Sequence, residues 1–311
     1  MPFGLGFFAA AGSAAQFIMA LAGGYNSSAN KLIRSGDSVT WTDISTSFGQ
    51  PYGIDAMSYG NNTFVVIANS QTTNGLATST DAVTWSYSTA PGSSNGGQLT
   101  FGNGLFLLST GSGTTVFTSP NGITWTSRAS ALQSSASPYG ATYGGGFYVV
   151  CGLFGTISSS TDGVTFTSRL RTNGNAFTRA AYKSNVWLVG GGDGIWRSTD
   201  GISFSQVSSL GGNALAAGSS LFIRGQNGGG LYTSPDGNTW TSRTSGFGST
   251  NIRAASFSNG LYIIGGGGSS TGGGKLGTSP DGITWTLRTS GFGTGGDDKI
   301  EAITSTTWAQ A

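Results

Sequence analysis

Six polar residues have the types and positions needed to bind a sugar-like ligand. They lie at or beside the first residue of short segments rich in small side chains, and they are Asp55, Gln98, Tyr139, Arg179, Arg253 and Glu301. Carboxylate and guanidinium groups can bridge sugar hydroxyls, and the ring of Tyr139 or of Tyr52 offers a face for stacking. Equivalent scaffold positions should resemble one another, whereas these residues differ in charge and size. We therefore predict a polar ligand site here.

Several catalytic and metal chemistries are excluded by composition. The 311 residues include no histidine, which removes Ser-His-Asp and Cys-His catalysis and every His-ligated metal site. Cys151 is the single cysteine, so the chain has no intrachain disulfide and no thiolate zinc cluster. It lies in an apolar run and is expected to be a core residue. The net charge of +2 is too small to indicate a nucleic acid or an anionic membrane as partner.

Two further features suggest chemistry that we do not expect. The adjacent carboxylates Asp297 and Asp298 could hold calcium, but two acids in a loop are more often solvated. The glycine runs 190–192, 228–230 and 265–268 lack the Lys-Ser/Thr that follows a phosphate-binding loop, so we interpret them as tight connections. We predict no enzymatic activity, no cofactor and no bound metal.

An internal repeat predicts the elements that must position the six polar residues. Seven segments share a Ser-x-Asp/Asn-Gly-x-Thr/Ser-aromatic pattern, and their closing aromatics lie 36 to 45 residues apart. A period near 40 is typical of one four-stranded propeller blade. The segments are 35–41, 79–85, 119–125, 160–166, 198–204, 234–240 and 279–285.

The repeated segment has the chemistry of a turn between two strands. Its Ser and Asp side chains can accept hydrogen bonds from nearby backbone N–H groups, and glycine suits a left-handed backbone position. The aromatic residue is expected to face inward between neighbouring sheets. Ser38 and Ala82 replace the glycine in two repeats, so those turns should be strained or of another type.

Two more strand signals precede each turn. The nearer one is a continuous apolar run, typical of a strand buried on both faces. The more distant one is a segment of small residues, which suits the crowded innermost strand. The expected order in each blade is thus small strand (A), apolar strand (B), then the hairpin (C and D). The apolar runs are 64–68, 105–108, 147–151, 186–189, 221–223 and 261–264, and the small segments are 55–59, 98–101, 140–143, 179–182, 214–217 and 253–257.

The two ends of the chain are expected to close the ring by sharing one blade. Residues 16–21 read as a B strand before the first turn, and residues 300–305 read as an A strand after the last. Closure of this kind removes the exposed sheet edges. Residues 8–13 also resemble an A strand, and the sequence leaves open which of the two segments fills the slot. The prediction is a single, all-β, seven-bladed propeller domain over residues 1–311.

The uncharged segment 3–23 could be mistaken for a membrane span. Its glycines and its place in the repeat favour a strand instead, and the lack of a preceding basic region fits a secretory signal poorly. If residues 300–305 fill the A slot, residues 1–12 are left as a hydrophobic arm. Its apolar side chains would dock on a neighbouring subunit, and they are Phe3, Leu5, Phe7 and Phe8.

The seven turns resemble the Asp-box, or bacterial neuraminidase repeat, of β-propeller proteins. They depart from the sialidase form, in which the glycine lies two residues after Asp and the spacing is one residue longer. The Asp-box is a folding element, so the resemblance implies architecture rather than catalysis. Sialidases need an inner arginine triad and a Tyr–Glu pair, but Arg128, Arg169, Arg243 and Arg288 follow the turn on the outermost strand, and Glu301 is the single glutamate.

Composition and the opening residues also resemble virion structural proteins of tailed bacteriophages. The chain is rich in Gly, with 55 residues, and only 8% of it is charged, against about 25% in ordinary soluble domains. This resemblance implies a non-enzymatic virion protein of the tail or a host-facing appendage, with other virion proteins and a host surface glycan as partners. The alternatives are a secreted bacterial propeller lectin and a degenerate sialidase-like glycosidase.

The ligand site is expected at the mouth of the central funnel, on the face opposite the seven turns. The loops that enter the A strands are long there, for instance 42–53 and 286–299. Arg253, Glu301 and Asp55 belong to consecutive blades once the ring closes. A mutual ion-pair network is therefore an alternative to ligand binding, and both interpretations stay open.

Overall fold

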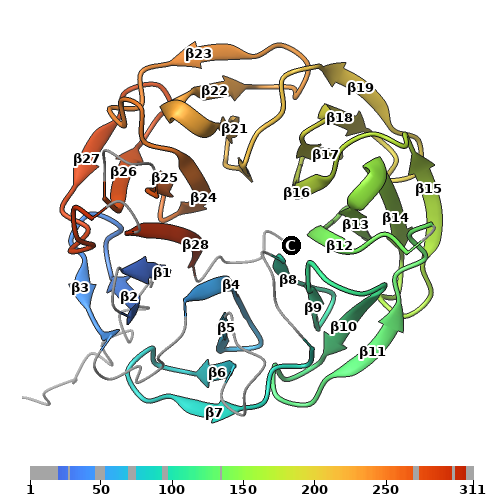
Figure 1. The fold of residues 1–311 in the computed structure, drawn as a ribbon, viewed down its shortest axis with the longest axis horizontal. Coiled ribbons are helices and arrows are strands. Elements are labelled where there is room, and N and C mark those ends of the chain that lie inside the picture. Colours follow the sequence, from blue (N-terminus) through green and yellow to red (C-terminus); the bar gives the residue numbers. More distant parts are fainter. Residues whose placement is uncertain are drawn as a thin grey trace, which may run out of the picture.

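Seven four-stranded antiparallel sheets stand around one central axis like the blades of a propeller (Figure 1). They are formed by the residues that this computed structural model describes, which are 20–26, 29–45, 53–68, 75–92, 97–133, 135–268, 273–295 and 298–305. In each blade the strands follow one another from the axis to the rim. This confirms the predicted seven-bladed propeller and its A-to-D strand order.

Blades 2 to 4 each use four consecutive strands. Blade 2 contains β4 (Ile54–Gly60), β5 (Thr63–Ala68), β6 (Leu76–Ser79) and β7 (Ser86–Ser88). Blade 3 contains β8 (Leu99–Gly102), β9 (Leu105–Ser109), β10 (Thr115–Ser119) and β11 (Thr126–Ala129). Blade 4 contains β12 (Pro138–Gly144), β13 (Phe147–Gly152), the 3-10 helix η1 (Leu153–Gly155), β14 (Thr156–Ser160) and β15 (Thr167–Arg171).

Blades 5 to 7 repeat this arrangement. Blade 5 contains β16 (Phe177–Lys183), β17 (Val186–Gly191), β18 (Gly194–Ser198) and β19 (Ser205–Ser208). Blade 6 contains β20 (Ala214–Ala217), β21 (Phe222–Gly225), the 3-10 helix η2 (Asn227–Gly229), β22 (Leu231–Ser234) and β23 (Thr241–Arg243). Blade 7 contains β24 (Ile252–Ser258), β25 (Leu261–Gly266), β26 (Lys275–Ser279) and β27 (Thr286–Arg288).

Blade 1 joins the two ends of the chain. Its strands are β28 (Lys299–Ser305), β1 (Ala20–Asn26), β2 (Ala29–Ser35) and β3 (Thr42–Asp43), in that order from the axis. The predicted closure through residues 300–305 is confirmed, because β28 pairs with β1 and takes the A slot. Residues 8–13 lie outside the described residues.

The predicted B strand at residues 16–21 ends too early, and its residues 16–19 lie outside the described residues. The strand runs over Ala20–Asn26 and so includes the glycines that we had placed after it. These glycines are needed, since a Cβ at Gly24 would lie 2.0 Å from the carbonyl oxygen of Lys299 on β28. Close approach of two backbones, rather than hydrophobicity, decides where this strand lies.

The C–D turns share one hydrogen-bonding pattern. In blade 5, Asp200 Oδ1 accepts the N–H groups of Ile202 and Ser203, while Ser198 Oγ accepts that of Gly201. Ala82 keeps this pattern at a left-handed φ of 52°, and Ser38 also has a positive φ, of 60°. These two turns are therefore strained, as expected, but they are not of another type.

The aromatic residue that closes each turn packs between adjacent blades. Trp85 of blade 2 is buried in a cluster with Leu21 and Leu32 of blade 1 and Val66 of its own blade. The B strands are buried along nearly their whole length, as β5 and β13 illustrate. The core thus consists of the contacts between neighbouring sheets, and these fix the inner strands around the axis.

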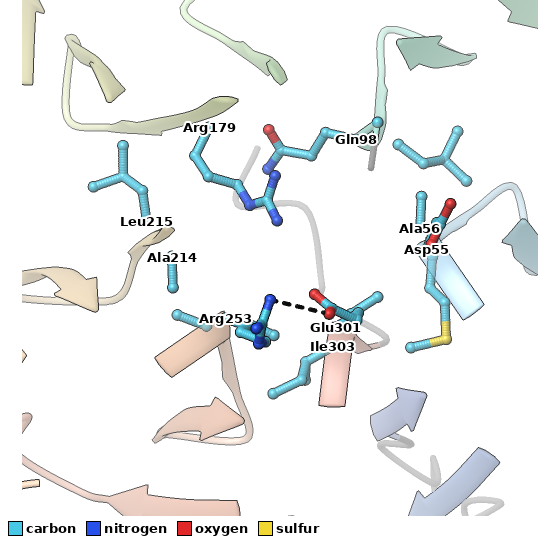
Figure 2. A pocket seen from close by; sticks show the side chains of 15 residues that line it. Asp55, Ala56, Gln98, Arg179, Ala214, Leu215, Arg253, Glu301 and Ile303 are labelled. Atoms are coloured by element: carbon cyan, nitrogen blue, oxygen red, sulfur yellow. Dashed lines mark hydrogen bonds and ion pairs between the residues drawn. The ribbon is translucent and has the colours of Figure 1, made fainter. Parts of the chain in front are cut away.

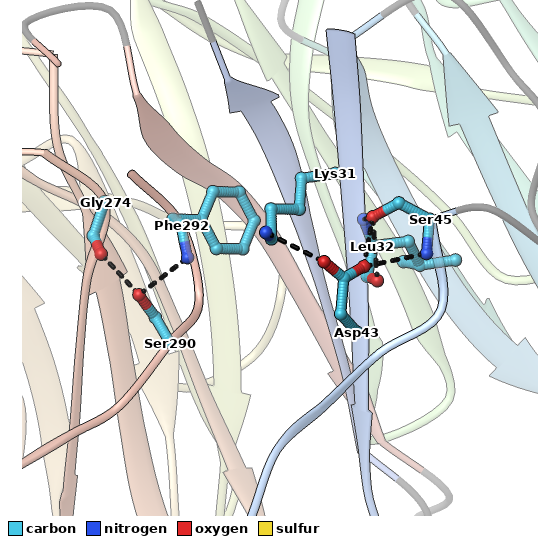
Figure 3. A network of polar contacts seen from close by, with 7 residues as sticks. All are labelled: Lys31, Leu32, Asp43, Ser45, Gly274, Ser290 and Phe292. Carbon is cyan, nitrogen blue, oxygen red and sulfur yellow. Dashed lines mark hydrogen bonds and ion pairs between the residues drawn. The ribbon is translucent and has the colours of Figure 1, made fainter. Parts of the chain in front are cut away.

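The seam between blades 7 and 1 is reinforced near the rim (Figure 3). Lys31 Nζ on β2 lies 2.8 Å from Asp43 Oδ2 and 5.8 Å from the ring centroid of Phe292, in the loop after β27. That loop is tied back to its own blade, because Ser290 Oγ donates to Gly274 O and accepts the Phe292 N–H. The cation–π contact of Lys31 with Phe292 therefore links the first and last blades of the chain, and the polar contacts hold the two residues in place within their own blades.

Among the described residues no helix is long and apolar enough to cross a membrane.

Candidate functional site

The inner strand of five blades contains a β-bulge near its start. The pairing between A and B strands skips one residue in each, and the skipped residues are Asp55, Tyr139, Thr178, Arg253 and Glu301. Bulges redirect side chains and are common beside binding sites. In blades 3 and 6 the register places Gly97 and Asn213 at the same level. We call these seven residues the bulge ring.

Arg179 does not take the position that the sequence alignment assigned to it. The bulge in β16 falls on Thr178, and Arg179 pairs with Gly190 as Ala254 pairs with Gly265 in blade 7. Arg179 therefore lies one residue deeper along its strand. Counting back from the aromatic that closes the inner strand, Tyr182 here and Phe257 in blade 7, would have given the correct alignment.

The residues one position further along the inner strands are mostly small, and we call them the second ring. It consists of Ala302, Ala56, Gln98, Gly140, Arg179, Ala214 and Ala254. Gln98 and Arg179 are its two large members, and Figure 2 shows both side chains extending into the central cavity.

A cavity of about 90 Å³ lies among these residues on the axis. It brings together five of the six predicted site residues, which are Asp55, Gln98, Arg179, Arg253 and Glu301. A second hollow of about 170 Å³ shares Arg179, Arg253 and Glu301 with it and is also lined by Thr178 and Asn213. Since the A strands begin here and the C–D turns lie at the other end of the strands, this is the mouth opposite the seven turns.

The predicted ion-pair network is present in part. Glu301 Oε1 lies 3.3 Å from Arg253 Nη1 and 3.0 Å from Lys299 Nζ. Arg253 is also held by the backbone, because its Nε donates to Gly267 O at 2.8 Å. Lys299 was missed by the sequence analysis, although its place at the start of the last inner strand, two residues before Glu301, was a signal.

The side chain of Gln98 reaches from blade 3 past blade 4 to blade 5. Its Oε1 accepts the backbone N–H of Ala141 at 3.0 Å and that of Ala180 at 3.2 Å, on the inner strands of blades 4 and 5. Its own backbone is fixed by Ser109, whose Oγ accepts the Gln98 N–H. Gln98 therefore narrows the channel on one side and leaves the opposite side open.

Arg179 has a different electrostatic setting from Arg253. Its Nη1 donates to Thr178 O at 2.9 Å, and among the described residues it forms no ion pair within 4.0 Å. Loss of water around the guanidinium lowers the pKa of Arg179, and the negative charges of Glu301 and Asp55 offset this only in part. A desolvated cation therefore faces the cavity without a close counter-charge in that part of the chain.

Tyr139 is the sixth predicted residue, and it does not line the cavity. It lies in the bulge of β12, half-buried, and its carbonyl accepts the hydroxyl of Ser109. The other proposed stacking residue, Tyr52, and the arm residues Phe3, Leu5, Phe7 and Phe8 lie outside the described residues.

The rim arginines lie on the outermost strands, as predicted, but they are half-buried rather than free. Each Nε donates to a hydroxyl on the C strand of its own blade: Arg128 to Thr118, Arg169 to Ser159, Arg243 to Thr233 and Arg288 to Thr278. These hydrogen bonds join the two outer strands of each of these blades.

Two other predictions about reactive groups have clear outcomes. Cys151 is buried as expected, and burial raises the pKa of its thiol to about 12. Asp298 is not solvated, since it is 2% exposed and its Oδ2 accepts the Gly295 N–H. Asp297 lies outside the described residues, among which no group of three or more His, Cys, Asp or Glu could hold a metal ion. The three glycine runs lie at the predicted B–C connections.

No protein-family model matches the sequence, and no curated protein matches it. Solved structures do match the fold. Virginiamycin B lyase from Staphylococcus aureus is 13% identical, with a TM-score of 0.66, over 84% of this chain and 97% of that one. A streptogramin B lyase is 12% identical, with a TM-score of 0.63 and 89% of each chain covered.

A propeller with another role matches comparably. The structure of YCF48 bound to D1 peptide is 16% identical, with a TM-score of 0.58, over 80% of this chain and 89% of that one. The chain is a β-propeller. Identities this low show the fold alone, because the same propeller supports catalysis in one neighbour and peptide binding in another.

Proposed function

We propose that this propeller is a non-enzymatic recognition protein that binds a small polar ligand, of the size of a sugar, at the central mouth. The observation that carries the proposal is the convergence of unlike polar side chains on one cavity, at positions where the other blades have small residues. Arg179 and Gln98 stand at a level filled elsewhere by alanine or glycine. Gln98 holds two backbone N–H groups of blades 4 and 5, but no ion pair among the described residues engages the guanidinium of Arg179, so a ligand is the simplest reason for it.

The ion-pair network alone does not account for this cavity. Glu301 is engaged by Arg253 and Lys299, which explains three of the charged residues. It leaves the desolvated guanidinium of Arg179 unexplained. An uncompensated charge away from water is costly, and a polar ligand that hydrogen-bonds to it would recover part of that cost.

The absence of histidine argues against the chemistry of the lyase neighbours. One structure of the Staphylococcus aureus enzyme is a variant in which a single histidine is replaced by alanine, and it is described as catalytically inactive. The present chain has no histidine that could take that role. This supports recognition rather than the histidine-dependent chemistry of that enzyme as the activity of the mouth.

A glycan array tests the binding proposal. The wild-type protein should bind a subset of glycans, and the Arg179→Ala, Arg253→Ala double variant should lose that binding. The matched control is the Arg128→Ala, Arg288→Ala double variant, which removes the same charge from the rim. Equal binding by the wild type and the mouth variant, or binding by neither, would overturn the proposal.

The setting that we propose is a virion, in its tail or a host-facing appendage. The support is the glycine-rich, charge-poor composition and the apolar residues Phe3, Leu5, Phe7 and Phe8. Mass spectrometry of purified virions should detect the chain, and Phe7→Asp should reduce its incorporation. A secreted lectin is the alternative, and it would bind sugar as an isolated monomer and be absent from particles.

A further inference from the structure

The lining of the central cavity is uneven because the residues of the second ring differ in size. Four consecutive blades, 6, 7, 1 and 2, place alanines at this level, and the cavity is lined by Ala214, Ala254, Ala302 and Ala56. Gln98 and Arg179 fill the opposite side. The four alanines therefore form a half-ring that leaves space for a few non-hydrogen atoms, and Gln98 and Arg179 close it.

Backbone N–H groups face this space. The residues that follow the second ring include Ala141 and Ala180, whose N–H groups point inward and are accepted by Gln98 Oε1. Their equivalents on the open side share the same register with their B strands, so their N–H groups also point inward. These equivalents are Leu215, Ala255, Ile303 and Met57, and all four line the cavity.

Gln98 shows what kind of atom these inward N–H groups bind. One carbonyl oxygen already bridges two adjacent inward N–H groups, at 3.0 and 3.2 Å. An oxygen atom of a ligand on the open side would meet the same arrangement. It would also meet the guanidinium of Arg179, which offers a fork of N–H donors suited to a planar carboxylate.

We propose that the half-ring binds the carboxylate of a hydroxy acid, such as a uronic acid, with Arg179 as its anchor. This inference rests on the proposed function and names its ligand class. The carboxylate lies in the inner cavity, between Arg179 and the inward amides. The hydroxyl-bearing part lies in the outer hollow, where Thr178, Asn213 and Glu301 supply polar partners.

The charges around the cavity favour an anion over a cation. Glu301 faces Arg253 and Lys299, so its charge is compensated twice. Asp55 attracts the guanidinium of Arg179 but lies beyond ion-pair distance of it. The charged residues that line the cavity are Arg179 and Arg253 against Asp55 and Glu301, and Lys299, paired with Glu301, adds a further positive charge beside it.

Isothermal titration calorimetry with glucuronate, glucose and acetate tests this proposal. Glucuronate should bind, glucose should bind at least about tenfold more weakly, and acetate should compete with glucuronate. Arg179→Met keeps the length of the side chain and should weaken glucuronate binding by about tenfold to a hundredfold. Arg128→Met, on the rim, should leave it unchanged.

Gln98→Glu gives a second and opposite test. The new carboxylate can accept the same two N–H groups while its other oxygen faces the side of Arg179. It should therefore act as an internal ligand, raising the melting temperature and reducing glucuronate affinity by about tenfold or more. Unchanged glucuronate affinity in this variant would count against the shared carboxylate site.

The outcomes separate this inference from the proposed function. If glucose binds as well as glucuronate and Arg179→Met has no effect, the carboxylate site is wrong but recognition at the mouth survives. If the glycan array is also empty, both fail. If glucuronate binds equally to folded wild-type and Arg179→Met proteins, the anchor assignment is overturned.

Discussion

The two ends of the blades differ in what they repeat. At the C–D turns, seven blades use nearly the same residues and the same hydrogen bonds, as Asp200 and Asp281 illustrate. At the opposite end, five blades share the same β-bulge, but the residue of the bulge ring is different in every blade. Here one blade has Asp55, the next Gly97, and others Arg253 and Glu301.

This difference separates scaffold from site. A turn side chain that accepts two backbone N–H groups is needed in every blade, so its identity is constrained. The skipped residues of the bulges support no common backbone bond, so their side chains are free to vary, and those of Asp55, Arg253 and Glu301 line the cavity. Variation on a repeated backbone is what we expect of a surface that recognises a ligand, and each prediction below tests that distinction.

The largest effect should come from removing the inner strand that closes the ring. Deleting residues 299–311 removes β28, which buries Ile300 and Ala302 and closes blade 1. Each apolar side chain of that size contributes roughly 1–3 kcal/mol on burial, and the deletion also exposes a sheet edge. We expect aggregation, measured by size-exclusion chromatography. Deleting only residues 306–311 is the control, and a monomeric 299–311 deletion with unchanged melting would contradict the closure.

Turn glycines should be the next most sensitive positions. Gly122→Ala places a Cβ 2.5 Å from Val65 Cγ2 of the neighbouring blade, at a φ of +73°. We expect it to lower the free energy of unfolding by about 2–4 kcal/mol, from left-handed strain and overpacking together. Gly146→Ala is a matched control, with a φ of +82° and open space around the Cβ. It should cost only about 1–2 kcal/mol in denaturant titrations, and equal costs would mean that the turn does not contact the next blade.

Acid should lower the free energy of unfolding, because each turn aspartate contributes to it. Hydrogen bonds from backbone N–H groups lower the pKa of Asp37, Asp81, Asp162, Asp200 and Asp281 to about 2, from 3.8. The folded state thus binds fewer protons than the unfolded state between these values. The contribution of these carboxylates to the free energy of unfolding should be constant above about pH 5 and fall as the pH decreases through 3.8 towards 2.

Asparagine at these positions should flatten that acid dependence. Asn121 already occupies one turn, and its Oδ1 accepts the N–H groups of Ile123 and Thr124 as an aspartate does. The triple variant Asp162→Asn, Asp200→Asn, Asp281→Asn should therefore be close to wild type at pH 7 and less sensitive to acid. Denaturant unfolding between pH 2 and pH 6 measures both, and an unchanged slope would show that other groups dominate.

The smallest effect on stability should be at the mouth. Arg179→Met removes a desolvated guanidinium that has no ion pair among the described residues, so it should change the free energy of unfolding by less than about 0.5 kcal/mol or raise it. A loss comparable to that of Gly122→Ala would make Arg179 part of the scaffold.

Much of the fold could be predicted because each repeated segment indicates a turn and the strands on both sides of it. The seven turns set the number of blades, and the unmatched segment 300–305 indicated how the ring closes. The close approach of one strand backbone to another could not be predicted in this way. The B strand of blade 1 was placed too early because Gly23 and Gly24 look like a loop, although the approach of β28 requires them.

Five of the six predicted residues lie together at the expected mouth of the channel, but not all at the expected level along their strands. Alignment by small residues put Arg179 in the bulge ring, since Arg179-Ala-Ala resembles Arg253-Ala-Ala. The bulge at Thr178 shifts Arg179 one residue deeper, into the half-closed second ring. The reach of Gln98 across two blades was also hidden, because side-chain hydrogen bonds to distant backbone leave no pattern in the sequence.

The most direct test of the distinction between scaffold and site is amide chemical-shift mapping during a glucuronate titration. The account predicts saturable shifts at Leu215, Ala255, Ile303 and Met57 and at residues adjoining Arg179, with no shifts at the seven C–D turns. Shifts concentrated at the turns, for instance at Ile123 and Ile202, or a complete absence of shifts at the mouth, would contradict it.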